Sequence, residues 1–482
     1  MAGNSSLDHL VSEITSHLAK KDICNALLCI QNGVERIIEE PLCAAQVFES
    51  KRLDALCQLI GQFSFDQLQN KHKSPSTSTP ELLYGYVATK LQISGGHTRV
   101  IEDFISARPK AKHIIFLTGV CGQTDDNCLS RLTTKFPKLR LVISPRCSLS
   151  ERLTWLQVQL LSFKFKGVYL FNHHQDSVAV AAFVPSLALQ ASFYHHGDHH
   201  LCLGVHLTHL EHIDFHPMGY HLCRQTFNLL NTYYPLTATD LGVSEHSSLI
   251  QPVGLVTCTA AGSNKVETPY VWHYTDMVVH LLKHTQGRHI HIGRLSLLAR
   301  LKIALGLSFH GVPRNKFIYI PWVSSVWDTL KQTRVNLYIA SFPYGGARTL
   351  VEVMGAGVPV ATHKHVFSPI LSCKELAYPS AFQWSTFNEL YEYCTELNTK
   401  TLAIQCKHSR LHYDQNYSSP VFNASLMTNG IATSEITPIE SVYAAQTDAW
   451  AFWVLNQIKI HNFLKTRMRQ LLKLIAKHIW TI

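Results

Sequence analysis

The chain has 482 residues, of which 46% are hydrophobic and 16% are charged, so it can form two sizeable cores. Its formal net charge of +10 favours anionic partners such as nucleotide diphosphates, acidic lipids or nucleic acid. Its thirteen cysteines form no CxxC pairs, which argues against a disulfide scaffold or a zinc ribbon and favours a reducing compartment. No run approaches the roughly 18 to 20 apolar residues of a membrane span, and the N-terminus lacks a signal-peptide pattern, so we expect a cytoplasmic protein.

Residues 1–84 are expected to form a helical N-terminal region. Apolar side chains recur there at helical spacing, as in Leu7, Leu10, Val11 and Ile14, without the alternation of a strand. Residues 71–80 are polar and contain prolines, which is typical of a linker.

Residues 85–240 are expected to form a first Rossmann-like domain. Short β-rich runs alternate there with helical patterns, which predicts a doubly wound parallel sheet. The expected strands cover 86–92, 113–117, 139–143 and 167–171, and the helices that follow them begin near 98, 127, 150 and 176.

A glycine turn, Gly95 and Gly96, separates the first expected strand from the first expected helix and is followed by His97. Ligands favour this position in open α/β sheets. The alternative is a plain tight turn, with Arg99 on a solvated helix face.

The densest group of acid and base residues lies at the end of an expected strand and includes His196, Asp198 and His199. Histidines beside a carboxylate can form a base with an orienting partner, in which Asp198 holds the tautomer of an imidazole. Two alternatives are that these residues pin a loop, or that they bind a metal with the histidines that follow. The latter are His206, His209, His212 and His216. Their spacing enforces no single geometry and Pro217 interrupts it, so we predict no metal site.

The alternation restarts after about residue 240 and predicts a second Rossmann-like domain over residues 241–440. After its first strand, small residues including Ser263 let the backbone approach a ligand, and Lys265 offers a charge to phosphate; the alternative is a generic turn. Trp322 follows a later strand, where it can frame a nucleotide base or belong to the core. Lys364 follows the last strand and either touches the ligand or lies in a solvated loop.

The most informative segment is 341–362, which reads as strand, glycine turn, helix and strand. Gly345 and Gly346 allow a tight turn, Thr349 lies in the first helical turn, and no acidic side chain precedes Glu352. A helix N-terminus of this kind presents N–H groups and the positive end of the helix dipole. The segment therefore predicts a site for an anion such as a diphosphate.

The sequence of this segment resembles that of GT-B glycosyltransferases. Residues 352–360, Glu-Val-Met-Gly-Ala-Gly-Val-Pro-Val, follow the recurring helix Glu-Ala-Met-Ala-x-Gly-x-Pro-Val of that superfamily. The preceding Phe-Pro-Tyr-Gly-Gly is similar to the Phe-Pro-x-Gly turn of adhesin N-glycosyltransferases and O-GlcNAc transferase, which are inverting enzymes. Tyr344 stands where retaining members carry a further Glu, and Ala347 and Arg348 stand where the inverting relatives have Asn or His before Thr.

The resemblance implies a GT-B architecture, in which two Rossmann-like doubly wound domains face a cleft. Residues 85–240 would form the acceptor side, and residues 241–440 the nucleotide-sugar side. It also implies inverting transfer of a hexosyl or N-acetylhexosaminyl group from a UDP-sugar to a protein or glycan acceptor. Helix dipole and lysine would stabilise the leaving diphosphate without metal or cofactor.

Site residues are also implied by the resemblance. The donor-binding residues are Gly95, Gly96, Ser263, Lys265, Trp322, Tyr344, Gly345, Gly346, Ala347, Arg348, Thr349, Glu352 and Lys364. The candidate bases are His97, placed as in the Gly-His turn of inverting plant-type members, and His196, Asp198 and His199, which are similar to a His-x-Asp-His segment of protein glycosyltransferases.

Two other functions fit the same architecture. A nucleotide-sugar 2-epimerase would need no acceptor, and a catalytically silent GT-B scaffold would only bind a partner or a membrane. Nucleic-acid binding is disfavoured, because the basic residues are dispersed outside the C-terminal helix and no nucleic-acid motif is present.

Residues 441–482 are expected to form C-terminal helices. Residues 455–482 place apolar side chains on one face and add basic residues without an acidic one. This helix is expected either to close the GT-B fold or to lie in the plane of an anionic membrane.

Overall fold

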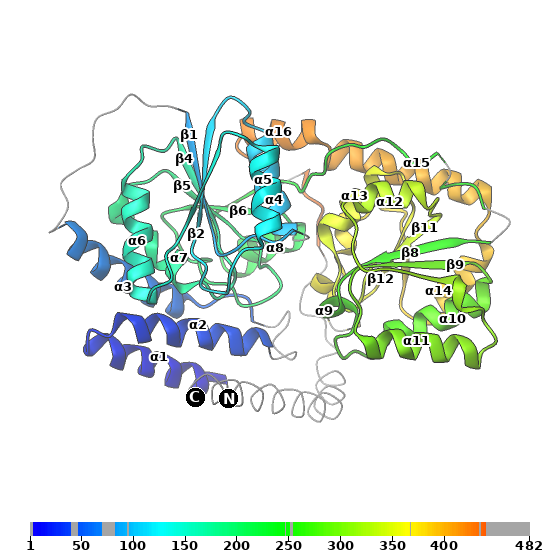
Figure 1. The fold of residues 1–482 in the computed structure, drawn as a ribbon, viewed down its shortest axis with the longest axis horizontal. Helices are drawn as coiled ribbons and strands as arrows, with labels where there is room; N and C mark the ends of the chain where they lie inside the picture. The colour runs from blue at the N-terminus through cyan, green and yellow to red at the C-terminus, as the bar shows by residue number, and fades with distance from the viewer. Residues whose placement is uncertain are drawn as a thin grey trace. The chain divides into compact units, whose positions relative to one another are not determined.

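The computed structural model describes residues 3–39, 47–69, 82–93, 96–245, 247–250, 254–366, 368–432 and 435–439. The predicted linker at 71–80, Gly95 and the C-terminal region 441–482 lie outside these residues. The chain divides into two compact units, of which the first contains Met1–Asp240 and Asp414–Ile439 and the second contains Leu241–Tyr413 (Figure 1). None of the described helices has the length and hydropathy needed to cross a membrane.

The N-terminal region is helical, as predicted, and belongs to the core of the first unit. Its helices are α1 (Gly3–Ala19), α2 (Ile23–Glu39) and α3 (Lys51–Gln69). Leu27 and Ile60 are fully buried in the same apolar cluster as Val87 and Leu170 of the sheet. Burial of these side chains away from water is the main force that holds α2 and α3 on the first unit.

The first unit contains a seven-stranded sheet whose strand order is β3-β2-β1-β4-β5-β6-β7. The strands are β1 (Leu83–Ala88), β2 (Lys112–Leu117), β3 (Leu139–Ile143), β4 (Gly167–Phe171), β5 (Ala191–Tyr194), β6 (Glu211–Asp214) and β7 (Asn231–Tyr233). All of their pairings are parallel, so the predicted doubly wound sheet is confirmed. The strand order reverses between β1 and β4, where doubly wound folds bind ligands.

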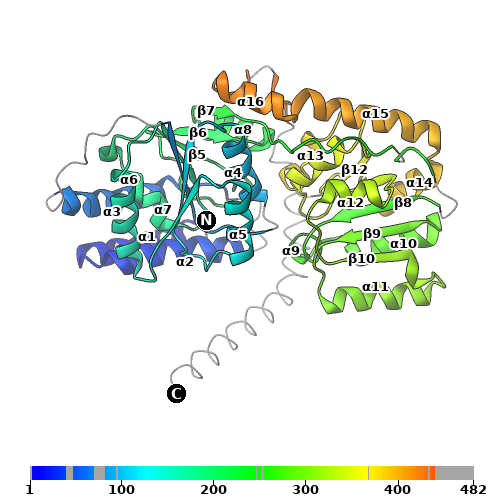
Figure 2. The ribbon, with the colours of Figure 1, turned by 45° about the horizontal axis from the view of Figure 1, so that its top comes forward.

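Helices cover both faces of this sheet. They are α4 (Gly96–Ser106), α5 (Asp126–Lys135), α6 (Leu149–Leu161), α7 (Ser177–Ala182), α8 (Pro217–His221) and a π-helical turn, η3 (Leu222–Thr226). In Figure 2, α3, α6 and α7 lie on one face, and α4 and α5 on the other. Side-chain caps define their beginnings: Asp125 and Asp176 cap α5 and α7, and Ser148 forms a capping box with Glu151 at α6.

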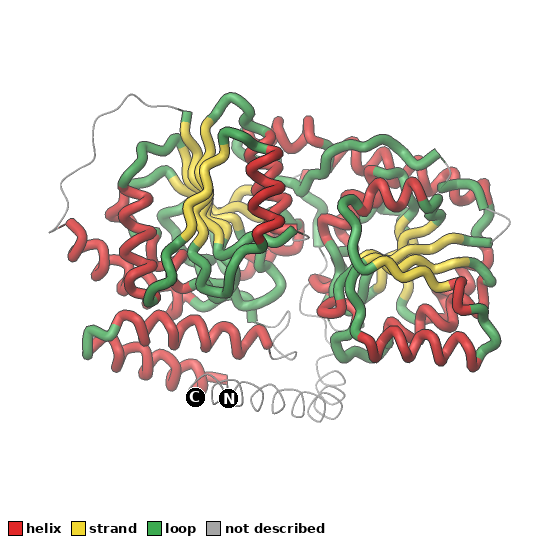
Figure 3. Tube along the Cα trace, in the orientation of Figure 1, coloured by secondary structure: helices red, strands yellow, loops and turns green. Residues whose placement is uncertain are grey.

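The second unit contains a six-stranded parallel sheet of order β10-β9-β8-β11-β12-β13. Its strands are β8 (Val256–Ala260), β9 (Arg288–Ile292), β10 (Phe317–Ile320), β11 (Leu337–Ile339), β12 (Val360–His363) and β13 (Phe382–Trp384). The helices that follow are α9 (Ser263–Val266), α10 (Tyr274–Thr285), α11 (Leu297–Phe309), α12 (Val326–Gln332), α13 (Ala347–Gly355) and α14 (Phe387–Glu396). Figure 3 shows each sheet between layers of helices, which is the second predicted Rossmann-like arrangement.

The chain returns to the first unit at Asp414, near the end of α15 (Thr399–Asn416), and continues through α16 (Ser419–Met427). From sequence, residues 414–439 are placed in the second domain, but in the structure they group with the first. Phe422 packs edge-on against Phe104, with ring centroids 5.3 Å apart, and the Ile431 N–H donates to the Tyr233 carbonyl at 3.0 Å. These contacts join segments about 200 or more residues apart, so no local pattern predicts them.

Candidate functional site

Two turns of the second unit form a candidate anion site. Strands β8 and β11 are neighbours in the parallel sheet, so the turns that follow them meet at one edge. The first turn leads into the short helix α9, which carries Lys265, and the second carries Gly345 and Gly346 ahead of α13.

Lys265 joins the two turns. Its Nζ donates to the Gly345 carbonyl at 2.6 Å, and its own carbonyl accepts from the Tyr344 N–H at 3.4 Å. A Cβ added at Gly346, the N-cap of α13, would lie 3.7 Å from the Lys265 Nζ and 3.4 Å from the Thr349 Oγ1. The ammonium group and the Thr349 hydroxyl therefore both lie beside the first turn of α13.

The electrostatics of this position favour a bound anion. No side chain caps α13, and its first turn contains no acidic residue. Among the ion pairs of the described residues, none includes Lys265, which is partly buried, and burial lowers the pKa of its ammonium group. An ammonium group beside the positive end of a helix dipole is electrostatically unfavourable until negative charge enters.

Gly345 shapes the turn rather than offering its own N–H to a ligand. That N–H donates to the Leu371 carbonyl at 2.7 Å. A Cβ at Gly345 would lie 2.7 Å from the Ser372 carbonyl oxygen and 2.8 Å from the Cys373 Sγ, so a side chain here would displace the neighbouring backbone.

Of the other predicted donor-binding residues, Gly96 begins α4 of the first unit, and those of the second unit fall into two groups. Ser263, Tyr344, Ala347, Arg348, Thr349 and Glu352 belong to α9, to the glycine turn or to α13. Within this group the Arg348 Nε lies 3.6 Å from the Glu352 Oε1. Burial raises the pKa of the Tyr344 hydroxyl to about 12. Trp322 is 50% exposed after β10, so it is not a core residue, and Lys364 is exposed after β12. Among the described interactions, neither side chain contacts Lys265 or residues 344–349.

The first unit gathers imidazoles at the carboxyl ends of its central strands. We call His97, His173, His174, His196, His199 and His200 the histidine cluster. The rings of His97 and His196 are stacked with centroids 4.4 Å apart, and that of His173 lies 5.3 Å from His97. The His174 ring lies 5.6 Å from that of His196. The predicted bases His97 and His196 thus come together, although they are far apart in sequence.

Burial holds four imidazoles of the histidine cluster, those of His97, His173, His196 and His200, in the neutral state. Burial, reinforced by repulsion from His173, lowers the pKa of His97 to about 3. Burial also lowers the pKa of His173 to about 4 and that of His200 to about 3, and it holds the pKa of His196 well below its usual range. At neutral pH these rings therefore carry lone pairs rather than positive charge.

The two nitrogens of the His97 ring have different surroundings. The backbone of Phe171 hydrogen-bonds to its ring, and its Nε2 is buried and has no hydrogen-bond partner in the described structure. A carbonyl that holds the proton on one ring nitrogen leaves the lone pair on the other. The Nε2 of His97 therefore carries a lone pair, although burial makes this nitrogen a weaker base than an ordinary imidazole.

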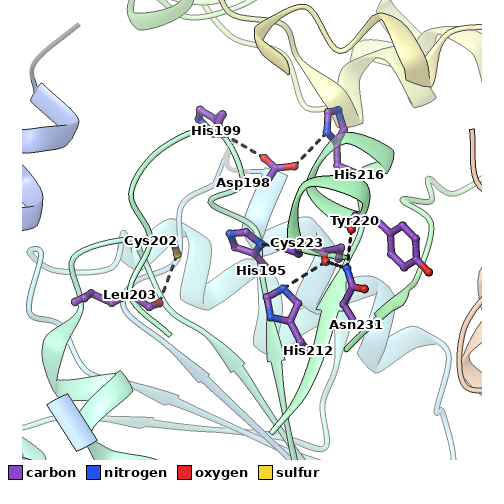
Figure 4. Close-up of polar contacts among 11 residues, drawn as sticks. His195, Asp198, His199, Cys202, Leu203, His212, His216, Tyr220, Cys223 and Asn231 are labelled. Carbon is purple, nitrogen blue, oxygen red and sulfur yellow. Dashed lines mark hydrogen bonds and ion pairs between the residues drawn. The ribbon is translucent and has the colours of Figure 1, made fainter. Parts of the chain in front are cut away.

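Asp198 lies between two imidazoles. Its carboxylate lies 3.1 Å from the His216 Nδ1 and 3.4 Å from the His199 Nδ1 (Figure 4). Although burial raises the pKa of Asp198, these two imidazoles outweigh it and hold the pKa well below its usual range. The imidazoles beside Asp198 are thus those of His199, its neighbour in the sequence, and of His216, which no sequence pattern links to it.

Sequence reasoning missed His173 and His174 as neighbours of His97. They directly follow β4, which pairs with β1, and this strand-end position was the available signal. It also missed the grouping of His195 with Asp214. His195 directly follows β5 and Asp214 ends β6, so the two meet only through the register of these strands.

Comparisons with solved structures show the fold. The similar structures include HepE of Anabaena in complex with UDP and glucose, which is 12% identical, with a TM-score of 0.54 over 72% of this chain and 99% of that one. An O-GlcNAc transferase mutant of Thermobaculum terrenum is 14% identical, with a TM-score of 0.51 over 88% and 83% of the two chains. A glycosyltransferase from Rickettsia africae is 11% identical, with a TM-score of 0.54 over 73% and 98%.

No protein-family model and no curated protein sequence matches the chain. The fold comparison nevertheless agrees with the two parallel sheets and the helices that surround them. The chain has the two-domain α/β architecture of GT-B glycosyltransferases.

Proposed function

We propose that this protein is a glycosyltransferase whose second unit binds a nucleoside-diphosphate sugar. The observation that carries the proposal is the Lys265 ammonium group beside the uncapped N-terminus of α13. Two phosphate groups would neutralise both positive features at once, and the N–H groups of a helix N-terminus match phosphate oxygens.

The proposed donor is a UDP-sugar. HepE, which shares the fold, has been crystallised with UDP and with UDP-glucose. Trp322, half exposed at the end of β10, offers an aromatic face to the base, and the Glu352 carboxylate offers acceptor oxygens to sugar hydroxyls.

The proposed reaction proceeds with inversion. His97 Nε2 removes the proton from the acceptor group as that group forms a bond to the anomeric carbon. The bond from that carbon to the diphosphate oxygen breaks on the opposite face, and the electron pair leaves with UDP. Lys265 and the α13 dipole stabilise the charge that develops there, which is the role that a metal ion fills in other transferases.

The acceptor is proposed to be a protein side chain or a glycan. The neutral imidazoles of the histidine cluster can accept hydrogen bonds from its donors. The first unit would thus supply acceptor activation, and the second unit would supply donor binding.

The proposal is tested by nucleotide binding to the purified chain, measured by calorimetry. UDP should bind more tightly than UMP, because UMP lacks the second phosphate. Lys265→Ala should weaken UDP binding on the order of 10- to 100-fold, the loss expected for a charge-assisted hydrogen bond of about 1.5 to 3 kcal/mol.

The matched control is Lys316→Ala. The Lys316 Nζ also donates to a backbone carbonyl of the second unit, that of Gln286 at 2.7 Å, but it lies away from α13. UDP affinity should survive this change. Equal affinities of the wild type and Lys265→Ala would refute the donor site, and absence of sugar transfer from every UDP-sugar to protein or glycan acceptors would refute the activity.

A further inference from the structure

Four potential metal ligands come together on one face of β5 and β6. His212 and Asp214 are two residues apart in β6, so their side chains point to the same face of the sheet. Tyr194 pairs with Ile213, which places His195 beside Asp214. Cys223 reaches the group from η3, the π-helical turn that follows α8.

The ligand atoms have the spacing of a small coordination site, since all four lie within 4.8 Å of one another. The His195 Nδ1 lies 3.0 Å from the Asp214 Oδ1 and 3.5 Å from the Cys223 Sγ. The Cys223 Sγ lies 3.9 Å from the Asp214 Oδ1, and the His212 Nε2 lies 3.3 Å from the Asp214 Oδ2. Metal–ligand bonds of about 2.0 to 2.3 Å place neighbouring atoms of a tetrahedron roughly 3.3 to 3.7 Å apart.

Without a metal ion, hydrogen bonds cannot satisfy all four side chains of this group at once. With a proton on Nδ1, His195 donates to Asp214, but then it cannot accept from the Cys223 thiol, whose remaining contact is the long one to Asp214. The His212 Nε2 faces the same carboxylate without forming a hydrogen bond. A single cation would draw all four donor atoms into favourable contact.

The surroundings hold the carboxylate in a ligand-like orientation. The Asn231 Nδ2 donates to the Asp214 Oδ2 at 2.6 Å, and the Arg224 Nε donates to the Asn231 Oδ1 at 3.0 Å. These contacts leave the Asp214 Oδ1 turned toward His195 and Cys223. Outer hydrogen bonds of this kind are typical of metal sites, and π-helical turns such as that of Cys223 occur often at functional sites.

We propose that His195, His212, Asp214 and Cys223 bind a metal ion, and that this ion is Zn²⁺. Figure 4 shows His195, His212 and Cys223 converging, next to Asn231 and apart from the Asp198 group. Two imidazoles, one thiolate and one carboxylate suit Zn²⁺, and four protein ligands leave no open position for substrate. All four side chains are buried, so the site is structural. Binding would release the thiol proton of Cys223.

The position of the site explains what such an ion would do. His195 directly precedes the segment that carries His196, Asp198, His199 and His200, and Cys223 follows the helix whose N-cap is His216. The ion would therefore tie β5, β6 and η3 together beneath the histidine cluster. It would position His196 and Asp198 without touching substrate.

The test is the metal content of the full chain after removal of weakly bound ions, measured by mass spectrometry. The wild type is expected to keep about one zinc per chain, and Cys223→Ser to lose most of it. Cys202→Ser is the matched control, because Cys202 is an equally buried cysteine of the same unit, with its Sγ 3.5 Å from the Leu203 carbonyl. This variant should keep its zinc.

Cobalt provides a second measurement that does not depend on the folding of a variant. Wild-type protein loaded with Co²⁺ should show thiolate-to-cobalt charge-transfer absorption, and Cys202→Ser should show it equally. A wild type that contains no zinc and gives no such band with Co²⁺ would overturn the site. So would a zinc content that Cys223→Ser and Cys202→Ser retain equally.

Discussion

The protonation state of Lys265 is more sensitive to its surroundings than that of a lysine on the surface. Its side chain is partly buried, and this burial lowers the pKa of its ammonium group. A bound diphosphate would favour the charged form and raise that pKa again. UDP binding and protonation of Lys265 should therefore be coupled.

The first prediction at the residue scale is that UDP affinity falls as the pH rises. Lys265 loses its proton at a pH below the ordinary lysine value of 10.5, so the charge that attracts phosphate disappears on the alkaline side. Calorimetry from about pH 7.5 to about pH 10 should show this fall, since phosphate stays fully ionised over that range. Lys265→Arg, whose guanidinium stays protonated, should bind UDP with little pH dependence; an equally steep fall in this variant would assign the effect to another group.

The second residue-scale prediction concerns His97. His97→Gln should lower the turnover number for sugar transfer by about 10²- to 10⁴-fold, because the base that accepts the acceptor proton is lost. UDP affinity should not change, because Lys265 and α13 belong to the other unit. His209→Gln is the control, since His209 also bonds to a backbone carbonyl, that of Phe183, but lies outside the histidine cluster. Equal turnover in the two variants would remove His97 from the mechanism.

At the scale of elements, one buried carboxylate connects α3 to the loop after β5. The Asp54 Oδ1 accepts from the Gly204 N–H at 2.7 Å, and its Oδ2 accepts from the His206 N–H at 2.9 Å. Burial raises the pKa of Asp54 to about 6 despite these contacts. The helical region thus helps to hold the segment that contains His196, His199 and His200 of the histidine cluster.

We therefore predict that Asp54→Ala destabilises the first unit by about 2 to 4 kcal/mol, because two buried N–H groups lose their acceptor. The folded pKa of Asp54 is about 6, above its ordinary value of 3.8, so the folded state takes up a proton first as the pH falls. The stability difference between wild type and variant should widen between about pH 6 and pH 4. Denaturant unfolding at several pH values measures it, and a difference that narrows over that window would contradict the assignment.

At the scale of the whole molecule, the chain leaves the first unit after Asp240 and returns to it at Asp414. Phe422 of α16 is 3% exposed and contacts Phe104 of α4. His97 lies in the first turn of the same helix, α4. The returning segment therefore completes the core beside the histidine cluster.

Phe422→Ala should destabilise the first unit by about 3 to 5 kcal/mol, the usual cost of a buried aromatic truncation. Hydrogen exchange should increase in α4 and in β5 to β7, and the strands of the second unit should keep their protection. Phe309→Ala is the control, because Phe309 is 86% exposed and its loss should change stability by less than about 0.5 kcal/mol. Increased exchange that is confined to the second unit would contradict the domain assignment of residues 414–439.

The helices and strands were predicted well from the sequence alone, because the sequence patterns that indicate them are local. The strands at 139–143 and 167–171 were located without error, and the helix of the glycine-turn motif begins at Ala347, directly after the two glycines. The first strand was placed too late, at 86–92 rather than Leu83–Ala88, because its polar continuation keeps a strand-like pattern. Periodicity, turn residues and caps act over a few residues, which is why a single sequence reveals them.

The sequence by itself determined two doubly wound sheets, a helical N-terminal region and the glycine turn beside an exposed helix N-terminus. Only the tertiary structure decided that Lys265 meets this turn and that His97 stacks on His196. It also decided that Asp198 pairs with His216 and that Cys223 joins His195, His212 and Asp214. These contacts depend on strand order and register, which bring distant residues to one sheet edge and leave no local pattern in the chain.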